Sequence, residues 1–226
     1  MSRASGLDLR LYLVTDPDLA GERSLIDVVD RACAGGVGLV QLRDKGAEAR
    51  DLLDLAIVLK TLLDPKGVPL VVNDRVDVAA AAGVGCHIGQ SDLPPEAARA
   101  ILGEEAILGL SIDRIEQAAA IDPGHLDYVA HGPFAATGTK SDAGEPVGTD
   151  GIKRVRDLAD LPLVAIGGID ATNTADAIRA GADGVAVVSA IMAAHDPKAA
   201  ATVLKDLVDR TIAARGDKKE RWGAVG

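Results

Sequence analysis

The sequence contains few cysteines and no long apolar run, and each absence excludes a class of protein. Its two cysteines, Cys33 and Cys86, lie far apart and lack the close spacing of a zinc site. No uninterrupted apolar stretch approaches the ~18 residues of a membrane span. The chain also does not open with a basic segment followed by an apolar run of signal length. We therefore expect reduced thiols, a cytoplasmic location and no membrane partner.

Positive charge is also scarce. The chain has 24 Lys and Arg residues against 34 Asp and Glu residues, which gives a net charge of −10 and a pI of about 4.8. Such a chain offers no basic face to offset the repulsion of nucleic-acid phosphates, so we do not expect nucleic acid as a partner. Any anionic ligand must be held by local charges. An apolar content of 48% over 226 residues still allows one sizeable core.

Eight short runs rich in Val, Leu and Ile alternate with segments of helical periodicity. In residues 48–63, for example, the apolar residues recur at helical spacing, while most charged residues fall between them. Glycines stand where several of these helices should stop. We expect strands near residues 9–14, 39–42, 69–72, 85–88, 107–110, 127–131, 163–166 and 184–188.

This alternation predicts an α/β protein with a single (β/α)₈ TIM barrel. We assign residues 1–213 to the barrel and residues 214–226 to a flexible, charged C-terminal tail. The structural alternative is an open, doubly wound sheet. That alternative is disfavoured because the GxGxxG fingerprint of dinucleotide-binding folds is missing after the first predicted strand.

The second predicted strand ends in the sequence QLRDK. Alternate residues of an extended strand face the same way, so Gln41, Arg43 and Lys45 should point together to the mouth of the barrel. Three polar groups on one face predict a ligand, and the two cations favour an anionic one. The alternative is a salt-bridged strand end without a ligand.

Carboxylates follow the next two predicted strands. Asn73 and Asp74 close the third strand, and Asp92 comes shortly after the fourth. Mg²⁺ prefers oxygen ligands and commonly takes one or two carboxylates together with substrate phosphate oxygens. Each aspartate alone also fits a turn, and Asp92 fits an N-cap of the following helix. Together they predict a magnesium site.

Glycines and a serine follow the last two predicted strands. Gly167 and Gly168 come after the seventh strand, and Ser189 stands at the end of the eighth. In TIM barrels, backbone N–H groups at this position commonly bind phosphate. The site therefore has a cationic part with carboxylates and a second, glycine-rich phosphate part. Two anionic substrates suggest group transfer between them.

The segment at residues 134–150 is long, polar and rich in Gly and Thr. A long loop at the catalytic face of a compact domain is usually functional. We interpret it as a lid that brings Thr137, Thr139 and Lys140 to the ligand.

These motifs resemble thiamine phosphate synthase. The resemblance covers most of the chain, in order: YLVTD, QLRDK, VVNDR, CHIGQSDL, GLS, DYVAHGP, TGTK, AIGGI and ADGVAVVSAI. It implies an enzyme that joins 4-amino-5-hydroxymethyl-2-methylpyrimidine diphosphate to 4-methyl-5-(2-hydroxyethyl)thiazole phosphate. The products would be thiamine monophosphate and pyrophosphate, formed through a dissociative reaction with Mg²⁺ as cofactor.

The resemblance also implies roles for individual residues. Arg43, Lys45, Asn73 and Lys140 would hold the diphosphate, with Asp74 and Asp92 binding Mg²⁺. Gln41 and Ser111 would surround the pyrimidine, Thr137 and Thr139 would contact ligands from the lid, and Gly168, Val188 and Ser189 would hold the thiazole phosphate. Of this set, the residues expected to be catalytic are Arg43, Lys45, Ser111 and Lys140.

Departures from the family pattern concern the pyrimidine side. Ile112 and Asp113 follow Ser111 where many members carry a small residue and then His, and the lid begins with Phe134, Ala135 and Ala136 instead of an aromatic and proline sequence. An acidic Asp113 near a diphosphate is unfavourable unless it faces away. We expect His131 to be partly buried with a satisfied hydrogen bond, and His87 to be structural.

Other functions remain open at this point. A thiazole tautomerase would share the barrel and the thiazole phosphate site, but it would not need Asn73, Asp74, Asp92 and Lys140. A non-catalytic phosphate-binding barrel should have lost some of these charged residues. A sugar-phosphate isomerase would need a paired acid and base that the sequence does not reveal. The sequence also leaves open a homo-oligomer and a carboxylated thiazole as acceptor.

Overall fold

The computed structural model describes residues 6–138 and 144–216. Its eight strands are all parallel and form a closed barrel in sequence order, with β8 pairing back to β1. The strands are β1 (Leu11–Val14), β2 (Leu39–Leu42), β3 (Leu70–Asn73), β4 (Gly85–Ile88), β5 (Leu108–Ile112), β6 (Tyr128–His131), β7 (Leu163–Ile166) and β8 (Gly184–Val187). The predicted (β/α)₈ barrel is confirmed, and the open sheet is excluded.

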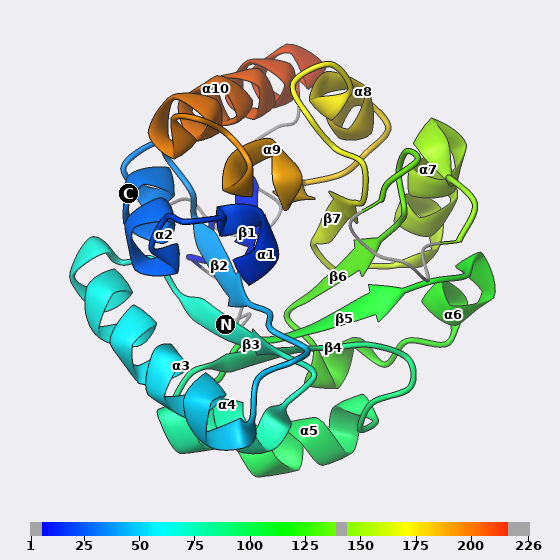
Figure 1. Ribbon diagram of the computed structural model, residues 1–226. Coiled ribbons are helices and arrows are strands. Elements are labelled where there is room, and N and C mark those ends of the chain that lie inside the picture. Colours follow the sequence, from blue (N-terminus) through cyan, green and yellow to red (C-terminus); the bar gives the residue numbers. More distant parts are fainter. Residues whose placement is uncertain (1–5, 139–143, 217–226) are drawn as a thin grey trace.

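Most helices surround the strands as an outer ring, and the short helices α1 and α9 lie inside this ring in the view of Figure 1. They are α1 (Pro17–Ala20), α2 (Leu25–Cys33), α3 (Ala49–Leu63), α4 (Val76–Ala82), α5 (Pro95–Leu102), α6 (Ile115–Ala119), α7 (Gly148–Leu158), α8 (Thr174–Arg179), α9 (Ser189–Met192) and α10 (Pro197–Arg215). Two short 3₁₀ turns, η1 (Asp64–Lys66) and η2 (Pro123–His125), complete the described elements. None of the helices that the structure describes is long and apolar enough to cross a membrane.

The helix α3 shows how local sequence sets this arrangement. Its residues Leu52, Ala56, Leu59 and Leu63 recur at helical spacing and are buried against the barrel, as the periodicity predicts. Glycine ends the next helix, because Gly83 follows α4 in the left-handed conformation at φ 64°. The strand β4 is thereby preceded by a helix that stops at a defined residue.

Two apolar layers hold the barrel together. The larger layer lies between the strands and the helices, and the smaller one fills the barrel interior with inward-facing strand residues such as Leu39 and Val71. The interior layer also contains Tyr12 and Tyr128, whose rings meet edge to face with centroids 5.8 Å apart. The barrel is therefore a packed core below the level of the strand ends.

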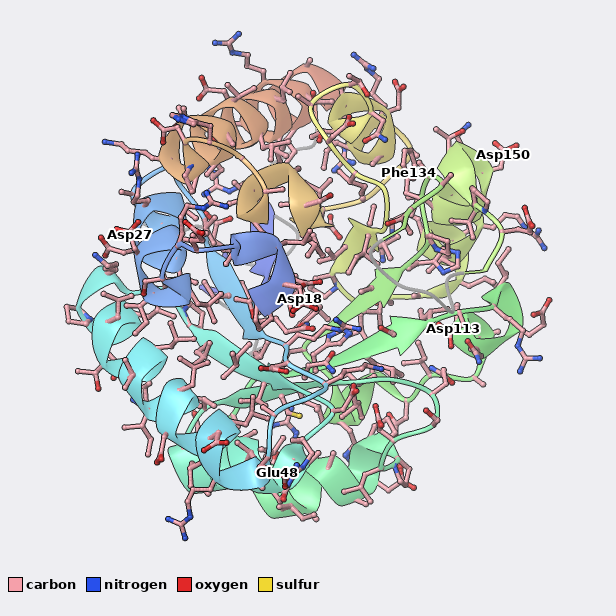
Figure 2. The ribbon with its side chains drawn as sticks, in the orientation of Figure 1. Asp18, Asp27, Glu48, Asp113, Phe134 and Asp150 are labelled. Carbon is pink, nitrogen blue, oxygen red and sulfur yellow. The ribbon has the colours of Figure 1, made fainter. Side chains whose placement is uncertain are left out.

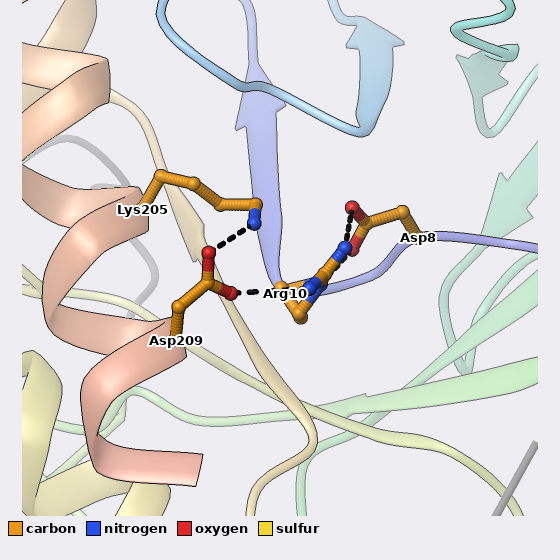
Figure 3. A network of polar contacts seen from close by, with 4 residues as sticks. All are labelled: Asp8, Arg10, Lys205 and Asp209. Carbon is orange, nitrogen blue, oxygen red and sulfur yellow. Dashed lines mark hydrogen bonds and ion pairs between the residues drawn. The ribbon is translucent and has the colours of Figure 1, made fainter. Parts of the chain in front are cut away.

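Ion pairs join the segment just before β1 to the last helix, α10. The guanidinium of Arg10 contacts Asp8 at 2.6 Å and Asp209 of α10 at 3.2 Å, and Lys205 contacts Asp209 at 2.6 Å (Figure 3). Most of these side chains are partly exposed, so each pair contributes little stability by itself.

A second ion pair is completely buried. Arg99 of α5 contacts Asp127, the residue before β6, at 2.9 Å, and their side chains are 3% and 2% exposed. Asp127 also accepts a hydrogen bond from the backbone N–H of Leu108 at the start of β5. The arrangement recurs where Arg156 of α7 contacts Asp183 before β8 at 2.9 Å. Charged side chains thus fix the amino-terminal ends of neighbouring strands.

Two predicted boundaries shift in the structure. The helix α7 begins at Gly148, so the last residues of the predicted lid at 134–150 are helical, and residues 139–143 lie outside the described residues. The helix α10 continues to Arg215, two residues past the predicted end of the barrel domain, and 217–226 of the predicted tail lie outside the described residues.

Candidate active site

A cavity of about 510 Å³ opens at the carboxyl ends of the barrel strands. Because all strands are parallel, their ends deliver side chains from distant parts of the sequence to this one place. The predicted site residues that line it are Gln41, Arg43, Asn73, Ser111, Thr137, Gly168, Val188 and Ser189. Both predicted halves of the site therefore face one cavity.

The other predicted residues have different positions. Lys45, Asp74 and Asp92 are not part of the cavity lining, although Asp74 directly follows the lining residue Asn73. Thr139 and Lys140 lie outside the described residues.

Asp74 and Asp92 form a pair of interacting carboxyl groups. Burial raises the pKa of Asp74, and the charge of Asp92 together with a hydrogen bond between the two carboxyls raises it further. Lys45 opposes this effect from 3.8 Å. Asp74 is also the only non-glycine residue with positive φ, at 62°, in the described chain. Two interacting carboxylates, one of them on a backbone with positive φ, are a costly arrangement, and a bound cation would relieve their repulsion.

The donor set of this pair fits Mg²⁺. It offers hard carboxylate oxygens, and no third His, Cys, Asp or Glu joins it within the described residues. The remaining coordination positions would therefore fall to water and substrate oxygens. The alternative role of Asp92 as a helix cap is wrong, because α5 has Pro94 at its N-cap and Asp92 instead accepts a hydrogen bond from the N–H of Gly89 at 2.6 Å.

The strand end that carries Arg43 is fixed by a residue that the sequence analysis did not single out. The buried hydroxyl of Thr15 accepts a hydrogen bond from the backbone N–H of Arg43 at 2.9 Å and donates one to its carbonyl oxygen at 3.3 Å. This contact sets where the Arg43 side chain leaves β2. The strand alternation predicted correctly that Gln41 and Arg43 share a face.

The glycine turn after β7 packs against the start of the lid segment. Gly167 and Gly168 have φ values of 90° and 65°, and a side chain at Gly168 would collide with the carbonyl oxygens of Ala135 and Ala136. Asn173, which the sequence analysis missed, donates a hydrogen bond to the Gly168 carbonyl at 2.8 Å. These glycines allow the chain's own backbone to approach closely, and the approach of a phosphate group to them stays a prediction.

A row of hydrogen-bonded side chains crosses the barrel interior, and its members Gln41, Tyr12, His87 and Ser111 line the cavity. Gln41 contacts the hydroxyl of Tyr12, which lies 2.9 Å from the hydroxyl of Tyr128. His87 joins this hydroxyl to Ser111 through its two ring nitrogens, at 2.9 Å on each side. The sequence analysis assigned no role to the tyrosines. The available signal was that the only two tyrosines of the chain fall on predicted strands.

The departures from the family pattern have distinct positions. Asp113 follows β5 (Figure 2) and does not face away, because it lines the cavity, as Arg114 and Glu145 also do. Ile112 also lines the cavity, although its side chain is almost entirely buried. The mouth of this side of the cavity therefore carries charges of both signs.

His131 is more buried than predicted. Its side chain is inaccessible, its Nδ1 lies 2.8 Å from the carbonyl oxygen of Ile112, and its Nε2 has no hydrogen-bond partner among the described residues. Burial lowers the pKa of His131, although the Ile112 carbonyl and the charge of Asp113 act in the opposite direction. The imidazole is thus held neutral beneath α7.

A closed barrel with cationic, carboxylate and glycine-rich strand ends around one cavity defines an enzyme for phosphorylated substrates. Residues 11–191 match the family model described as thiamine monophosphate synthase. The chain belongs to this family.

Relatives support the assignment over nearly the whole chain. The thiamine-phosphate synthase of Azorhizobium caulinodans is 53% identical over 203 residues, covering 89% of this chain and 96% of the relative. That of Xanthobacter autotrophicus is 54% identical, covering 92% and 98%. Among solved structures, thiamine phosphate pyrophosphorylase from Pyrococcus furiosus superimposes with a TM-score of 0.83 at 32% identity, covering 91% of this chain and 98% of that one.

Proposed function

We propose that this thiamine-phosphate synthase joins the pyrimidine diphosphate to the thiazole phosphate named above and releases pyrophosphate. The observation that carries the proposal is the shared cavity. Arg43, Asn73 and Ser111 line one part of it, and Gly168 and Ser189 line another. A cavity of about 510 Å³ with two such parts suits two phosphorylated substrates that must meet.

The reaction that suits these residues is dissociative. No nucleophile and base pair is needed, because the leaving diphosphate departs first and the pyrimidine stabilises the resulting cation. The guanidinium of Arg43 and the ammonium groups of Lys45 and Lys140 would stabilise the negative charge that grows on the leaving group. A lid that excludes water would protect the cation until the thiazole nitrogen attacks.

Asp74 and Asp92 are the residues that would hold Mg²⁺. When bound, this ion supplies positive charge to the diphosphate oxygens. The raised pKa of Asp74 and its pairing with Asp92 support this role. Lys45, which lies 3.8 Å from Asp74, would then be positioned to contact the same diphosphate.

The finer assignments complete the proposal. Gln41 and Ser111 would bind the pyrimidine, Thr137 and Thr139 would contact ligands from the lid, and Gly168, Val188 and Ser189 would bind the thiazole phosphate. We also propose a cytoplasmic enzyme, which suits the small charged substrates. The plain thiazole phosphate is the proposed acceptor, and a carboxylated thiazole is the alternative.

The deciding experiment measures pyrophosphate release with both substrates and Mg²⁺, omitting each component in turn, and identifies thiamine monophosphate by mass. Product that requires all three components supports the proposal. Binding of the thiazole phosphate without product would favour a tautomerase or a binding barrel. The variant Lys140→Ala should slow the chemical step much more than it weakens thiazole phosphate binding. If it weakens only that binding, Lys140 does not belong to the diphosphate site.

A further inference from the structure

The row of side chains that crosses the barrel links Gln41 to Ser111, the two residues proposed to contact the pyrimidine. It runs from Gln41 through Tyr12, Tyr128 and His87 to Ser111, and every link is a hydrogen bond. Both end residues line the cavity, and so do Tyr12 and His87. Tyr12 and Tyr128 are 1% and 0% exposed, so water does not compete for their hydroxyl groups. The row therefore connects the two ends through the protein interior.

Packing leaves the three central residues little freedom to break these bonds. The rings of Tyr12 and Tyr128 meet edge to face, and the imidazole of His87 stacks on Tyr128 with centroids 5.5 Å apart. Burial raises the pKa of both tyrosines, which keeps both hydroxyls protonated. A buried hydroxyl that lost its partner would incur the full cost of desolvation. Each hydroxyl must therefore donate to one neighbour and can accept from the other.

This requirement allows two arrangements of donors and acceptors along the row, here called the first and the second order. In the first, the amide of Gln41 donates to Tyr12, Tyr12 to Tyr128, Tyr128 to Nδ1 of His87, and Nε2 of His87 to Ser111. In the second, every donor and acceptor is exchanged, which reverses the Gln41 amide and moves the His87 proton to Nδ1. Reversal of the Gln41 amide at one end therefore requires an exchange of donor and acceptor roles at Ser111 at the other end.

The two orders present different hydrogen-bonding groups to a ligand. In the first, Gln41 has its carbonyl oxygen free as an acceptor and Ser111 has its hydroxyl proton free as a donor. In the second, Gln41 offers its amino group and Ser111 can only accept. A 4-aminopyrimidine, which offers an amino donor beside a ring-nitrogen acceptor, matches the amide of the first order. A 4-oxo ring, with a carbonyl acceptor beside a ring N–H donor, matches the Gln41 amide of the second order.

We propose that Tyr12, Tyr128 and His87 are positioning residues that make Gln41 and Ser111 reorient together, and that this coupling makes the enzyme select an amino-substituted over an oxo-substituted pyrimidine. This inference rests on the proposed function, in which Gln41 and Ser111 surround the pyrimidine. Its physical basis is that a site with committed donors and acceptors rejects a ligand that leaves them unpaired. Without the central hydroxyls, the Gln41 amide could reverse independently of Ser111, and the site could bind either ring.

The test compares kcat/KM for the 4-aminopyrimidine diphosphate with that for its 4-oxo analogue. Tyr128→Phe removes the hydroxyl at the centre of the row and keeps the ring that packs on Tyr12 and His87. We expect the ratio of the two kcat/KM values to fall by about tenfold or more relative to the wild type. Tyr12→Phe should lower this ratio similarly. The double variant should lower the ratio little further, because the loss of one hydroxyl already uncouples Gln41 from Ser111.

Thr211→Val is the matched control. It removes a buried hydroxyl that donates to the backbone of Leu207 within α10, and it should leave the ratio unchanged. An unchanged ratio in both folded tyrosine variants, or additive effects in the double variant, would overturn the proposal. Tyr12→Phe keeps the test decisive if Tyr128→Phe does not fold. Absence of product from the aminopyrimidine with the wild-type enzyme would instead refute the proposed function.

Discussion

A methyl group at Gly168 would lie 2.6 Å from the carbonyl oxygen of Ala135. These two residues come from different strand ends, and their contact seats the start of the lid segment on the glycine turn that lines the cavity. The glycine turn after β7 and residues 135–136 after β6 are therefore packed tightly against each other.

The variant Gly168→Ala tests this contact. It would force alanine into φ 65° and against two backbone oxygens, and we expect a loss of about 3 kcal/mol in the free energy of unfolding. Gly83→Ala is the matched control, because Gly83 has φ 64° and open space at its Cβ, so it should lose only about 1 kcal/mol. Urea unfolding measures both. Equal losses would show that the contact with Ala135 carries no energy.

The carboxyl pair leads to a second prediction. Replacing Asp92 by Asn removes the charge that helps to raise the pKa of Asp74. We expect kcat to fall at least about 100-fold and the Mg²⁺ concentration for half-maximal rate to rise, because one of the two carboxylates proposed to hold Mg²⁺ is lost.

In the absence of divalent ions, the same variant should melt at a higher temperature than the wild type near neutral pH, since the repulsion of Asp74 is relieved. Asp77→Asn, on the exposed side of α4, serves as the control for loss of one negative charge. A normal Mg²⁺ dependence in Asp92→Asn would remove the metal assignment.

The two ion-pair networks should differ greatly in their effects on stability. Asp127→Ala leaves the guanidinium of Arg99 buried without its charge partner, and we expect it to lower the free energy of unfolding by about 3–5 kcal/mol. Asp209→Ala affects the partly exposed network of Figure 3 and should cost less than about 1 kcal/mol. Denaturant titration compares them. Similar losses in both variants would contradict the importance of burial.

His131 predicts a specific pH dependence of stability. Its pKa is lowered in the folded protein below the ordinary value of 6.5, so the unfolded chain binds a proton at a higher pH than the folded chain does. The stability contribution of the neutral imidazole is complete above about pH 6.5 and is lost as the pH falls below it. His131→Leu should therefore lose less stability between pH 7.5 and pH 5.5 than the wild type.

Chemical unfolding at the two pH values measures this difference. His195→Gln changes an exposed histidine and should retain the wild-type pH dependence. An identical pH dependence in His131→Leu and the wild type would show that His131 takes up its proton equally in both states.

Much of the site could be predicted because strand periodicity is a local property. Alternation along β2 placed Gln41 and Arg43 on one face, and the parallel strand order placed them with Ser111 and Gly168. The same reasoning did not reveal Thr15 or Asn173, because their hydrogen bonds reach a different strand end or a turn whose shape depends on the whole chain.

The sequence by itself determined the eight strand and helix units, the closed barrel and the chemical types at the strand ends. These follow from apolar periodicity and from glycines at helix ends, both of which act over a few residues. The tertiary structure alone decided that Asp74 and Asp92 interact, that Gly168 packs against Ala135, and that Tyr12 and Tyr128 join Gln41 to Ser111. Such contacts depend on side-chain directions across the barrel, which are set only when all eight strands have closed.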